Sequence, residues 1–183
     1  MRTFYLIRHG AAESFSTFFA HGRSDADRAL TPRGTTQCLA AANSIRASLK
    51  DVKPEVGLRF FTSNLLRAQQ TGTILFEELE KLGLCQQKPM TVSGLTPDDT
   101  VNKALETIKR YASELDPDQS GYTPVFVTHQ PLISALIANL CACPPFDAAM
   151  DTASVAMLRA EVIMPGCCDL VATFHHPVGI AAV

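Results

Sequence analysis

Thr3-Phe4-Tyr5-Leu6-Ile7-Arg8-His9-Gly10 opens the chain with an apolar run that ends in an arginine, a histidine and a glycine. Residues 3–8 are rich in side chains that favour strands, so they predict a buried β-strand. The glycine after His9 predicts a turn. In sheets of parallel strands, ligands bind just beyond the carboxyl ends of the strands, which makes His9 a candidate site residue.

Segments with helical and strand-like patterns alternate along the rest of the chain. Thr31-Pro32 combines a capping hydroxyl with a proline suited to the first helical position, and predicts a helix that runs to Lys50. The apolar residues at helical spacing in it are Leu39, Ala42, Ile45 and Leu49. Further predicted elements are a strand over Val56–Thr62, a helix capped by Ser63 or Asn64 and ended by Gly83, a short strand over Met90–Val92, a helix opened by Pro97-Asp98-Asp99-Thr100 that carries Leu115, a loop over Asp116–Gly121, a strand over Pro124–Thr128, a helix from Pro131 to about Leu140, and late strands over Val155–Val162 and Leu170–Phe174. This alternation predicts a three-layer α/β/α sandwich with a mostly parallel mixed sheet.

The composition is that of an ordinary globular protein, with 46% hydrophobic and 19% charged residues. A length of 183 residues predicts one domain over 1–183. The net charge of −2, without any run of lysine or arginine, argues against nucleic acid or an anionic membrane as a partner. The N-terminal apolar run is too short for a signal sequence, and no apolar run approaches about 18 residues, so we expect a cytoplasmic protein.

Cysteine usage leaves several readings open. The six cysteines are Cys38, Cys85, Cys141, Cys143, Cys167 and Cys168. Three disulfides are conceivable, but a chain of this size does not need them. The spacing of the last four matches none of the usual zinc patterns. Reduced, partly buried thiols are therefore expected, and no metal site.

Polar residues that follow predicted strands indicate a site for an anion. His9, Ser63 and His129 each come directly after a strand and should meet at one edge of the sheet. Arg8 and Arg67, the latter at the start of a helix, add guanidinium groups that bind phosphate through two parallel hydrogen bonds. Helix N-termini add free N–H groups, and a neutral imidazole can carry a phosphoryl group. Each residue alone has an ordinary structural explanation, so the prediction depends on their occurring together.

Four segments resemble, in the same order, the motifs of the histidine phosphatase superfamily, the phosphoglycerate-mutase-like proteins. They are Leu6–Gly10, Leu30–Gly34 with Gln37, Thr62–Thr71 and Val127–His129. The short chain, together with Gly94–Pro97 and His129–Leu132, resembles the SixA branch of phosphohistidine phosphatases. Gln130 departs from that branch, in which leucine is expected, and the loop over Phe15–Asp27 is longer than usual.

This resemblance implies a phosphoglycerate-mutase-like fold without a large cap domain, and it implies a role for each motif residue. His9 would be the nucleophile that accepts the phosphoryl group. The residues implied to bind the phosphoryl oxygens are Arg8, Gly10, Arg67, His129 and Gln130. No metal or organic cofactor is implied. The implied partner is a phosphorylated histidine phosphotransfer protein or domain of a bacterial phosphorelay, in two-component signalling.

The residues available as a general acid bear on the substrate. Mutases and many phosphomonoesterases of the family place a carboxylate in the region that here reads Ser93–Asp99, which contains no glutamate. An ester needs such an acid because alkoxide leaves poorly, whereas the imidazole of phosphohistidine leaves well once its other nitrogen is protonated. We therefore expect a phosphohistidine protein phosphatase. One alternative is a small-molecule phosphomonoesterase that uses Asp98 or Asp99 as the acid, although both also suit the first turn of a helix. The other is an inactive module that binds phosphoproteins.

Overall fold

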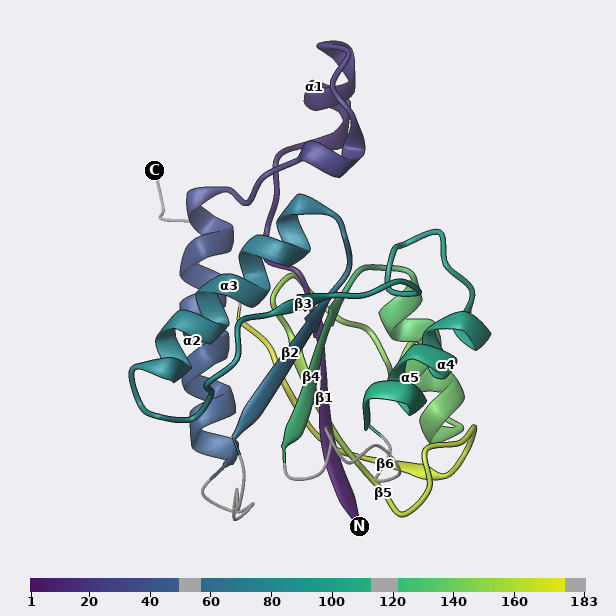
Figure 1. Cartoon of the computed structure of the whole chain (residues 1–183). Helices are drawn as coiled ribbons and strands as arrows, with labels where there is room; N and C mark the ends of the chain where they lie inside the picture. Colours follow the sequence, from purple (N-terminus) through teal and green to yellow (C-terminus); the bar gives the residue numbers. More distant parts are fainter. Residues whose placement is uncertain (50–56, 113–121, 177–183) are drawn as a thin grey trace.

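The computed structural model describes residues 1–49, 57–112 and 122–176. Its six-stranded sheet has the order β3-β2-β4-β1-β5-β6 (Figure 1). The strands are β1 (Arg2–Arg8), β2 (Leu58–Thr62), β3 (Met90–Thr91), β4 (Thr123–Thr128), β5 (Val155–Ala160) and β6 (Cys168–Phe174). Strands β3, β2, β4 and β1 are parallel, whereas β5 and β6 are antiparallel to their neighbours. The predicted mostly parallel mixed sheet is confirmed.

Helices cover both faces of the sheet and complete the three predicted layers (Figure 1). Helices α2 (Pro32–Ser48) and α3 (Leu66–Glu80) lie on one face, and α4 (Val101–Ala112) and α5 (Leu132–Cys141) lie on the other. The alternation along β1 explains both cores, because successive side chains of a strand point to opposite faces. Phe4 and Leu6 belong to the core under α4 and α5, and Tyr5 and Ile7 to the core under α2 and α3. Among the described helices, none has the length and apolar character needed to cross a membrane.

The predicted start of α2 is confirmed, and so is its buried face at Ala42, Ile45 and Leu49, whereas Leu39 was predicted wrongly. Thr31 is the N-cap, its Oγ1 accepts a hydrogen bond of 3.2 Å from the Gly34 N–H, and a proline follows. Leu39 is 40% exposed, and the face toward the sheet includes Cys38 and Ala41. Cys38 and Ala41 are small, and a search for large apolar residues does not detect them.

Two further predictions about local structure need correction or lie outside the described residues. The N-cap of α3 is Leu65, without a capping side chain, because the Ser63 hydroxyl is directed to a histidine instead. The predicted ends at Lys50 and Val56, Leu115 of the third helix and the loop over Asp116–Gly121 fall outside the described residues.

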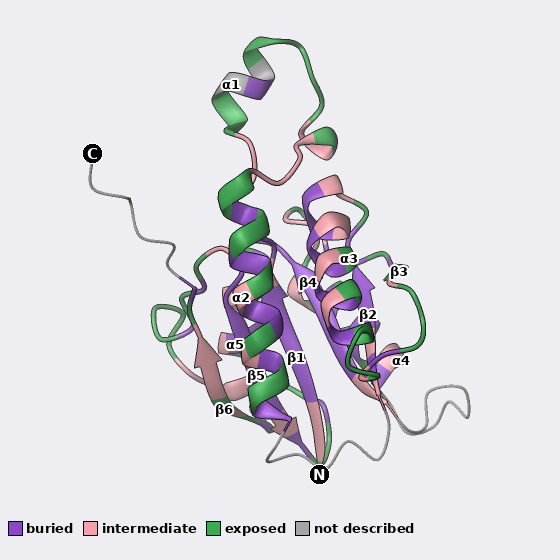
Figure 2. Ribbon diagram, turned by 90° about the vertical axis from the view of Figure 1, so that its left-hand side faces the viewer, coloured by how far each residue is buried: buried purple, intermediate pink, exposed green. Residues whose placement is uncertain are grey.

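An arm formed by residues 12–30 projects beyond the carboxyl ends of the parallel strands (Figures 1 and 2). The arm contains the short helix α1 (Phe15–Ala20) and the 3-10 helix η1 (Asp25–Asp27), both within the long loop expected over Phe15–Asp27. Its base is closed by an antiparallel bridge between Ala12 and Leu30 and by a hydrogen bond of 3.0 Å from the Glu13 N–H to the Ala29 carbonyl. Figure 2 shows that much of its outer part is exposed.

Candidate active site

A pocket of about 700 Å³ lies at the carboxyl ends of the parallel strands, beside the arm. It brings together residues that are far apart in the chain, as predicted for polar groups that follow strands. The predicted site residues that line it are Arg8, His9, Arg67, Asp98, His129 and Gln130. Further lining residues are Phe15, Asp25 and Arg28 from the arm, and Arg33 from the first turn of α2.

The backbone and one ring nitrogen of His9 are held by hydrogen bonds directly after β1. Its N–H donates to the Thr128 carbonyl at 3.0 Å, and its carbonyl accepts from the Ala153 N–H at 3.0 Å. Its Nδ1 lies 2.7 Å from the Gly10 carbonyl oxygen. A carbonyl can only accept, so Nδ1 carries the proton and Nε2 has a free lone pair. Nε2 is therefore the atom of His9 that can act as a nucleophile.

The electrostatic surroundings keep the His9 ring neutral. The imidazole is buried, with 8% of the residue exposed. Burial is the main cause that lowers the pKa of His9 to about 3, and the charges of Arg67 and Arg8 add to it, against the opposing effect of the Gly10 carbonyl. At neutral pH the lone pair on Nε2 is therefore available.

His129 lies beside His9 and is bound by Ser63. The ring centroids of His9 and His129 are 4.9 Å apart, and the rings are inclined by 50°. His129 Nε2 is 2.5 Å from Ser63 Oγ, with both residues buried. Burial, followed by the repulsion that two protonated rings of His9 and His129 would experience and by the charge of Arg67, lowers the pKa of His129 to about 2, so this ring is also neutral.

Three side-chain nitrogens of the pocket residues have no hydrogen-bond partner among the described residues. Arg8 Nη1 donates to the Met150 carbonyl at 2.8 Å, and both terminal nitrogens of Arg67 donate to Asp25. Among the described residues, four buried side-chain nitrogens lack a partner, and three of these are Arg8 Nε, Arg67 Nε and His129 Nδ1. Buried polar groups are almost always hydrogen-bonded, because leaving one unpaired costs about 1–3 kcal/mol. The two arginine donors, and His129 Nδ1 when it carries the ring proton, match the oxygens of an anionic ligand.

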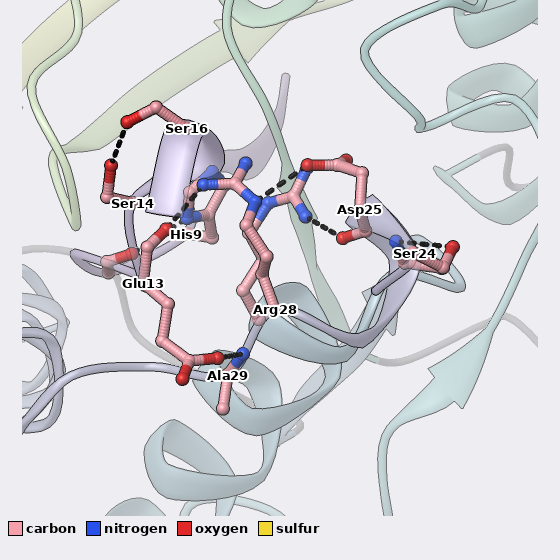
Figure 3. A network of polar contacts seen from close by, with 11 residues as sticks. His9, Glu13, Ser14, Ser16, Ser24, Asp25, Arg28 and Ala29 are labelled. Atoms are coloured by element: carbon pink, nitrogen blue, oxygen red, sulfur yellow. Dashed lines mark hydrogen bonds and ion pairs between the residues drawn. The ribbon is translucent and has the colours of Figure 1, made fainter. Parts of the chain in front are cut away.

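Asp25 and Arg28 line the pocket from the arm, and reasoning from the sequence missed both. Arg28 Nε donates to Asp25 Oδ1 at 2.6 Å, and Arg28 Nη1 donates to the Glu13 carbonyl at 2.6 Å (Figure 3). The Ala29 N–H donates in turn to the Glu13 carboxylate at 2.9 Å (Figure 3). The arm contains several charged residues, and this could have marked it as a part of the anion site. The spacing of these residues in the sequence does not indicate which side chains they pair with.

Gly10 and Gln130, both implied by the resemblance to bind the phosphoryl oxygens, differ in their surroundings. The Gly10 N–H donates to Thr71 Oγ1 at 3.1 Å, so this group is already used within the fold. Gly10 instead allows close packing, since a Cβ there would lie 2.7 Å from the Gly34 carbonyl oxygen. Gln130 lines the pocket, and its side-chain amide donates to Ser134 Oγ at 2.7 Å.

The two aspartates that were candidates for a general acid occupy different environments. Asp98 lines the pocket. Asp99 accepts hydrogen bonds from the backbone and hydroxyl of Thr96, at 2.9 and 2.6 Å, and pairs with Lys103 at 2.7 Å. Burial opposes the charge of Asp99, but these bonds outweigh it and lower the pKa of the carboxyl. Both aspartates precede α4, which has no acidic residue in its first turn, so the predicted helical position is wrong; Asp99 contacts the helix through Lys103.

Metal-binding and disulfide patterns are not found in the described part of the chain. No group of three or more histidine, cysteine, aspartate or glutamate side chains there is arranged to hold a metal ion. The six cysteines are unpaired, and burial raises the pKa of Cys38 and Cys85 to about 11.

A family model of the histidine phosphatase superfamily (branch 1) matches residues 4–89, which include His9 and Arg67 and end before His129. A search of curated proteins finds no match. Among solved structures, the protein histidine phosphatase SixA complexed with tungstate has a TM-score of 0.66 at 23% identity, over 93% of this chain and 95% of that chain. The putative phosphohistidine phosphatase SixA from Agrobacterium tumefaciens has a TM-score of 0.68 at 17% identity, over 95% and 97%. A mycobacterial glucosyl-3-phosphoglycerate phosphatase complexed with VO3 has a TM-score of 0.63 at 19% identity, over 94% and 98%.

These likenesses establish a shared fold, and the family match covers the motifs that contain His9 and Arg67. The fold is the phosphoglycerate-mutase-like one that the motifs predicted, and the described residues add no large cap domain to it. Residues 4–89 thus match the histidine phosphatase superfamily (branch 1), and the fold as a whole is similar to that of SixA proteins.

Proposed function

We propose that the protein is a phosphohistidine protein phosphatase that works through a covalent phospho-His9 intermediate. The observation that carries the proposal is the arrangement around His9. A neutral ring with its lone pair on Nε2 stands in a pocket with unpaired donors on Arg8, Arg67 and His129. That combination fits a phosphoryl group that is attacked by nitrogen while its oxygens are held. The proposal includes one domain over 1–183 and a cytoplasmic location.

In the first step, His9 Nε2 attacks the phosphorus atom, and the bond from phosphorus to the substrate imidazole nitrogen breaks. The leaving imidazole takes the electron pair of that bond, and its other nitrogen retains a proton, so it departs as a neutral group. Arg8, Arg67 and His129 stabilise the negative charge on the three equatorial oxygens. Arg28 adds positive charge at the same pocket.

In the second step, water attacks the phosphorus atom of phospho-His9, and the bond to Nε2 breaks. The electron pair returns to Nε2, and the water proton passes to the phosphate product or to solvent. The Gly10 carbonyl keeps the proton on Nδ1 throughout, so the His9 ring leaves as a neutral imidazole. A neutral imidazole therefore leaves in both steps, and neither step requires a carboxylic acid.

The substrate class depends on the acids of the pocket. Structural neighbours include SixA proteins, whose names describe protein or phosphohistidine phosphatases, and a glucosyl-3-phosphoglycerate phosphatase, so the fold does not separate the two classes. Among the described lining residues, the carboxylates are Asp25 and Asp98. Asp25 is paired with two arginines, and these bonds outweigh its burial and keep the pKa of its carboxyl low, so it is a poor acid. A phosphohistidine carried by a phosphotransfer protein or domain of a phosphorelay fits this site.

The alternative is a small-molecule phosphomonoesterase with Asp98 as its general acid. One observation favours it, namely that Asp98 lines the pocket. Asp99, the other candidate, is bound to Thr96 and Lys103. A third hypothesis, an inactive phosphoprotein-binding module, has less support because it gives no reason for a lone pair on His9 Nε2.

The decisive experiment mixes the protein with a phosphorylated histidine phosphotransfer domain and follows both phosphate release and acid-labile phosphate on His9. A simple phosphate ester is tested in parallel. The proposal requires transfer to His9 and a clear preference for phosphohistidine. A preference for the ester that is lost in Asp98→Asn would establish the alternative, and binding without turnover would establish the inactive module.

A further inference from the structure

Asp25 connects the arm to the two guanidinium groups of the pocket. Its Oδ2 pairs with Arg67 Nη2 at 2.9 Å, and its Oδ1 pairs with Arg28 Nε at 2.6 Å. Its backbone carbonyl also accepts from Arg67 Nη1 at 2.8 Å. One residue therefore holds both arginines, and it binds Arg67 through its side chain and its backbone together.

The bonds to Asp25 use only one edge of Arg67. A guanidinium group offers five N–H donors in a planar fork. Asp25 occupies the edge formed by Nη1 and Nη2, whereas Nε is buried and unpaired. The edge formed by Nε and the second N–H of Nη2 is the one left for an anion. A carboxylate on one edge fixes the plane of the group, and thereby the direction in which the other edge points.

The position of Asp25 is itself well defined. It is the first residue of η1, and the side chain of Ser24 accepts from the Ala26 N–H at the start of this turn. Arg28, at the end of the same turn, is tied to the Glu13 carbonyl across the base of the arm (Figure 3). Since the Arg67 side chain is only 3% exposed, this pairing is shielded from solvent on the arginine side. Such a pair orients its members more firmly than a surface ion pair does.

We propose that Asp25 is a positioning residue for phosphoryl transfer, which acts through Arg67 and Arg28 and directs the Nε edge of Arg67 toward the phosphoryl oxygens. The inference rests on the proposed function and deepens it. It differs from a model in which the Asp25 carboxylate competes with phosphate for the arginines. Removing the carboxylate weakens anion binding if Asp25 positions the arginines, and it strengthens anion binding if Asp25 competes with the anion.

The test measures the affinity of the whole protein for inorganic phosphate in Asp25→Ala, Asp25→Asn and a matched control, Asp27→Asn. Asp27 is an exposed residue of the same 3-10 helix. Asp27→Asn removes one negative charge, as Asp25→Asn does. We expect Asp25→Ala to weaken phosphate binding by about 10-fold or more, because small displacements of a positioning group cost about that much. Asp25→Asn, which retains one side-chain acceptor, should be affected less, and Asp27→Asn should be unchanged.

Two further readouts separate positioning from general structural support. If Asp25 acts through Arg67, then Asp25→Ala should have little effect on phosphate affinity in an Arg67→Ala background, because coupled residues are not additive. The NMR signal of the Arg67 Nε–H should shift on adding phosphate in the wild type, and shift much less in Asp25→Ala. Circular dichroism and thermal unfolding establish whether each variant is folded. If Asp25→Ala does not fold, Asp25→Asn, which has the same shape as the wild-type side chain, is used as the test variant in its place.

Tighter phosphate binding in Asp25→Ala would overturn the proposal in favour of competition. Unchanged binding, an equal loss in Asp27→Asn, or full additivity with Arg67→Ala would overturn it as well. None of these measurements needs a phosphohistidine substrate. The result for Asp25 therefore stays readable even if no phospho-His9 is found, which would contradict the proposed function instead.

Discussion

Ser63 Oγ and His129 Nε2 are joined by a hydrogen bond of 2.5 Å between two buried residues that are 66 positions apart in the chain. The Leu65 N–H donates to the same hydroxyl oxygen at 3.4 Å, which leaves the hydroxyl proton for His129. If Ser63 donates, the ring proton of His129 is on Nδ1, the nitrogen without a protein partner. A neutral His129 then becomes a hydrogen-bond donor to a phosphoryl oxygen.

Ser63→Ala is expected to remove this control of the tautomer. We predict that kcat/KM falls by about 10-fold, which corresponds to the loss of one buried hydrogen bond of about 1–2 kcal/mol. Ser63→Thr keeps the hydroxyl and should retain most of the activity. Nitrogen NMR of His129 reports the tautomer directly, and an unchanged spectrum in Ser63→Ala would contradict the assignment.

His9→Ala should abolish turnover, with a loss of about 10³-fold or more, because the covalent intermediate can no longer form. Acid-labile phosphate should appear on His9 when the wild type is mixed with a phosphorylated donor, and it should be absent in the variant. His21→Ala, on the exposed arm, is the matched control and should keep both signals. Labelling of a histidine other than His9 would show that the nucleophile was misassigned.

The lowered pKa values of His9 and His129 predict how stability depends on pH. Both groups are neutral when folded, with pKa values of about 3 and about 2, whereas the unfolded chain binds their protons below about 6.5. The unfolded state therefore binds more protons between about pH 6.5 and pH 3. The free energy of unfolding should fall as the pH drops through this window, with up to about 1.4 kcal/mol per pH unit from each histidine.

Denaturant unfolding between pH 7 and 4 tests this linkage. The wild type should lose stability toward acid more steeply than His9→Asn or His129→Asn, each of which removes one titrating ring. Parallel curves for the three proteins would mean that these rings titrate normally in the folded state.

Asp98 and Asp99 should differ when each is replaced. Asp98→Asn should leave the phosphohistidine rate within about twofold, because the imidazole leaving group needs no acid. Asp99→Ala should instead lower the free energy of unfolding by about 1 kcal/mol, through loss of the hydrogen bonds from Thr96 in the segment before α4. Rates on phosphohistidine and on an ester, together with thermal unfolding of both variants, check the prediction. A large loss of phosphohistidine activity in Asp98→Asn would show that the reaction does use an acid.

Much of the fold was predictable because its signals are local. The cap and proline at Thr31-Pro32, the apolar run before His9 and the run before His129 each predict an element within one short window. The location of the pocket followed from the general property of parallel sheets that residues after strands meet at one edge. Within α2 only Leu39 was predicted wrongly, since it is exposed while the smaller Cys38 beside it is buried.

The sequence by itself determined the alternation of strands and helices, the order of the motifs and the presence of His9, Arg8, Arg67 and His129 at one edge. These features depend on periodicity and spacing, which short-range sterics and burial translate directly into structure. Only the tertiary structure decided that Asp25 clamps Arg67, 42 residues away, and that Ser63 turns to His129 instead of capping a helix. Such contacts leave no periodic pattern, because they form only after the packed sheet has brought distant segments together. The proposed nucleophile was thus predictable from the sequence, whereas the residues that contact and orient its neighbours were decided by packing.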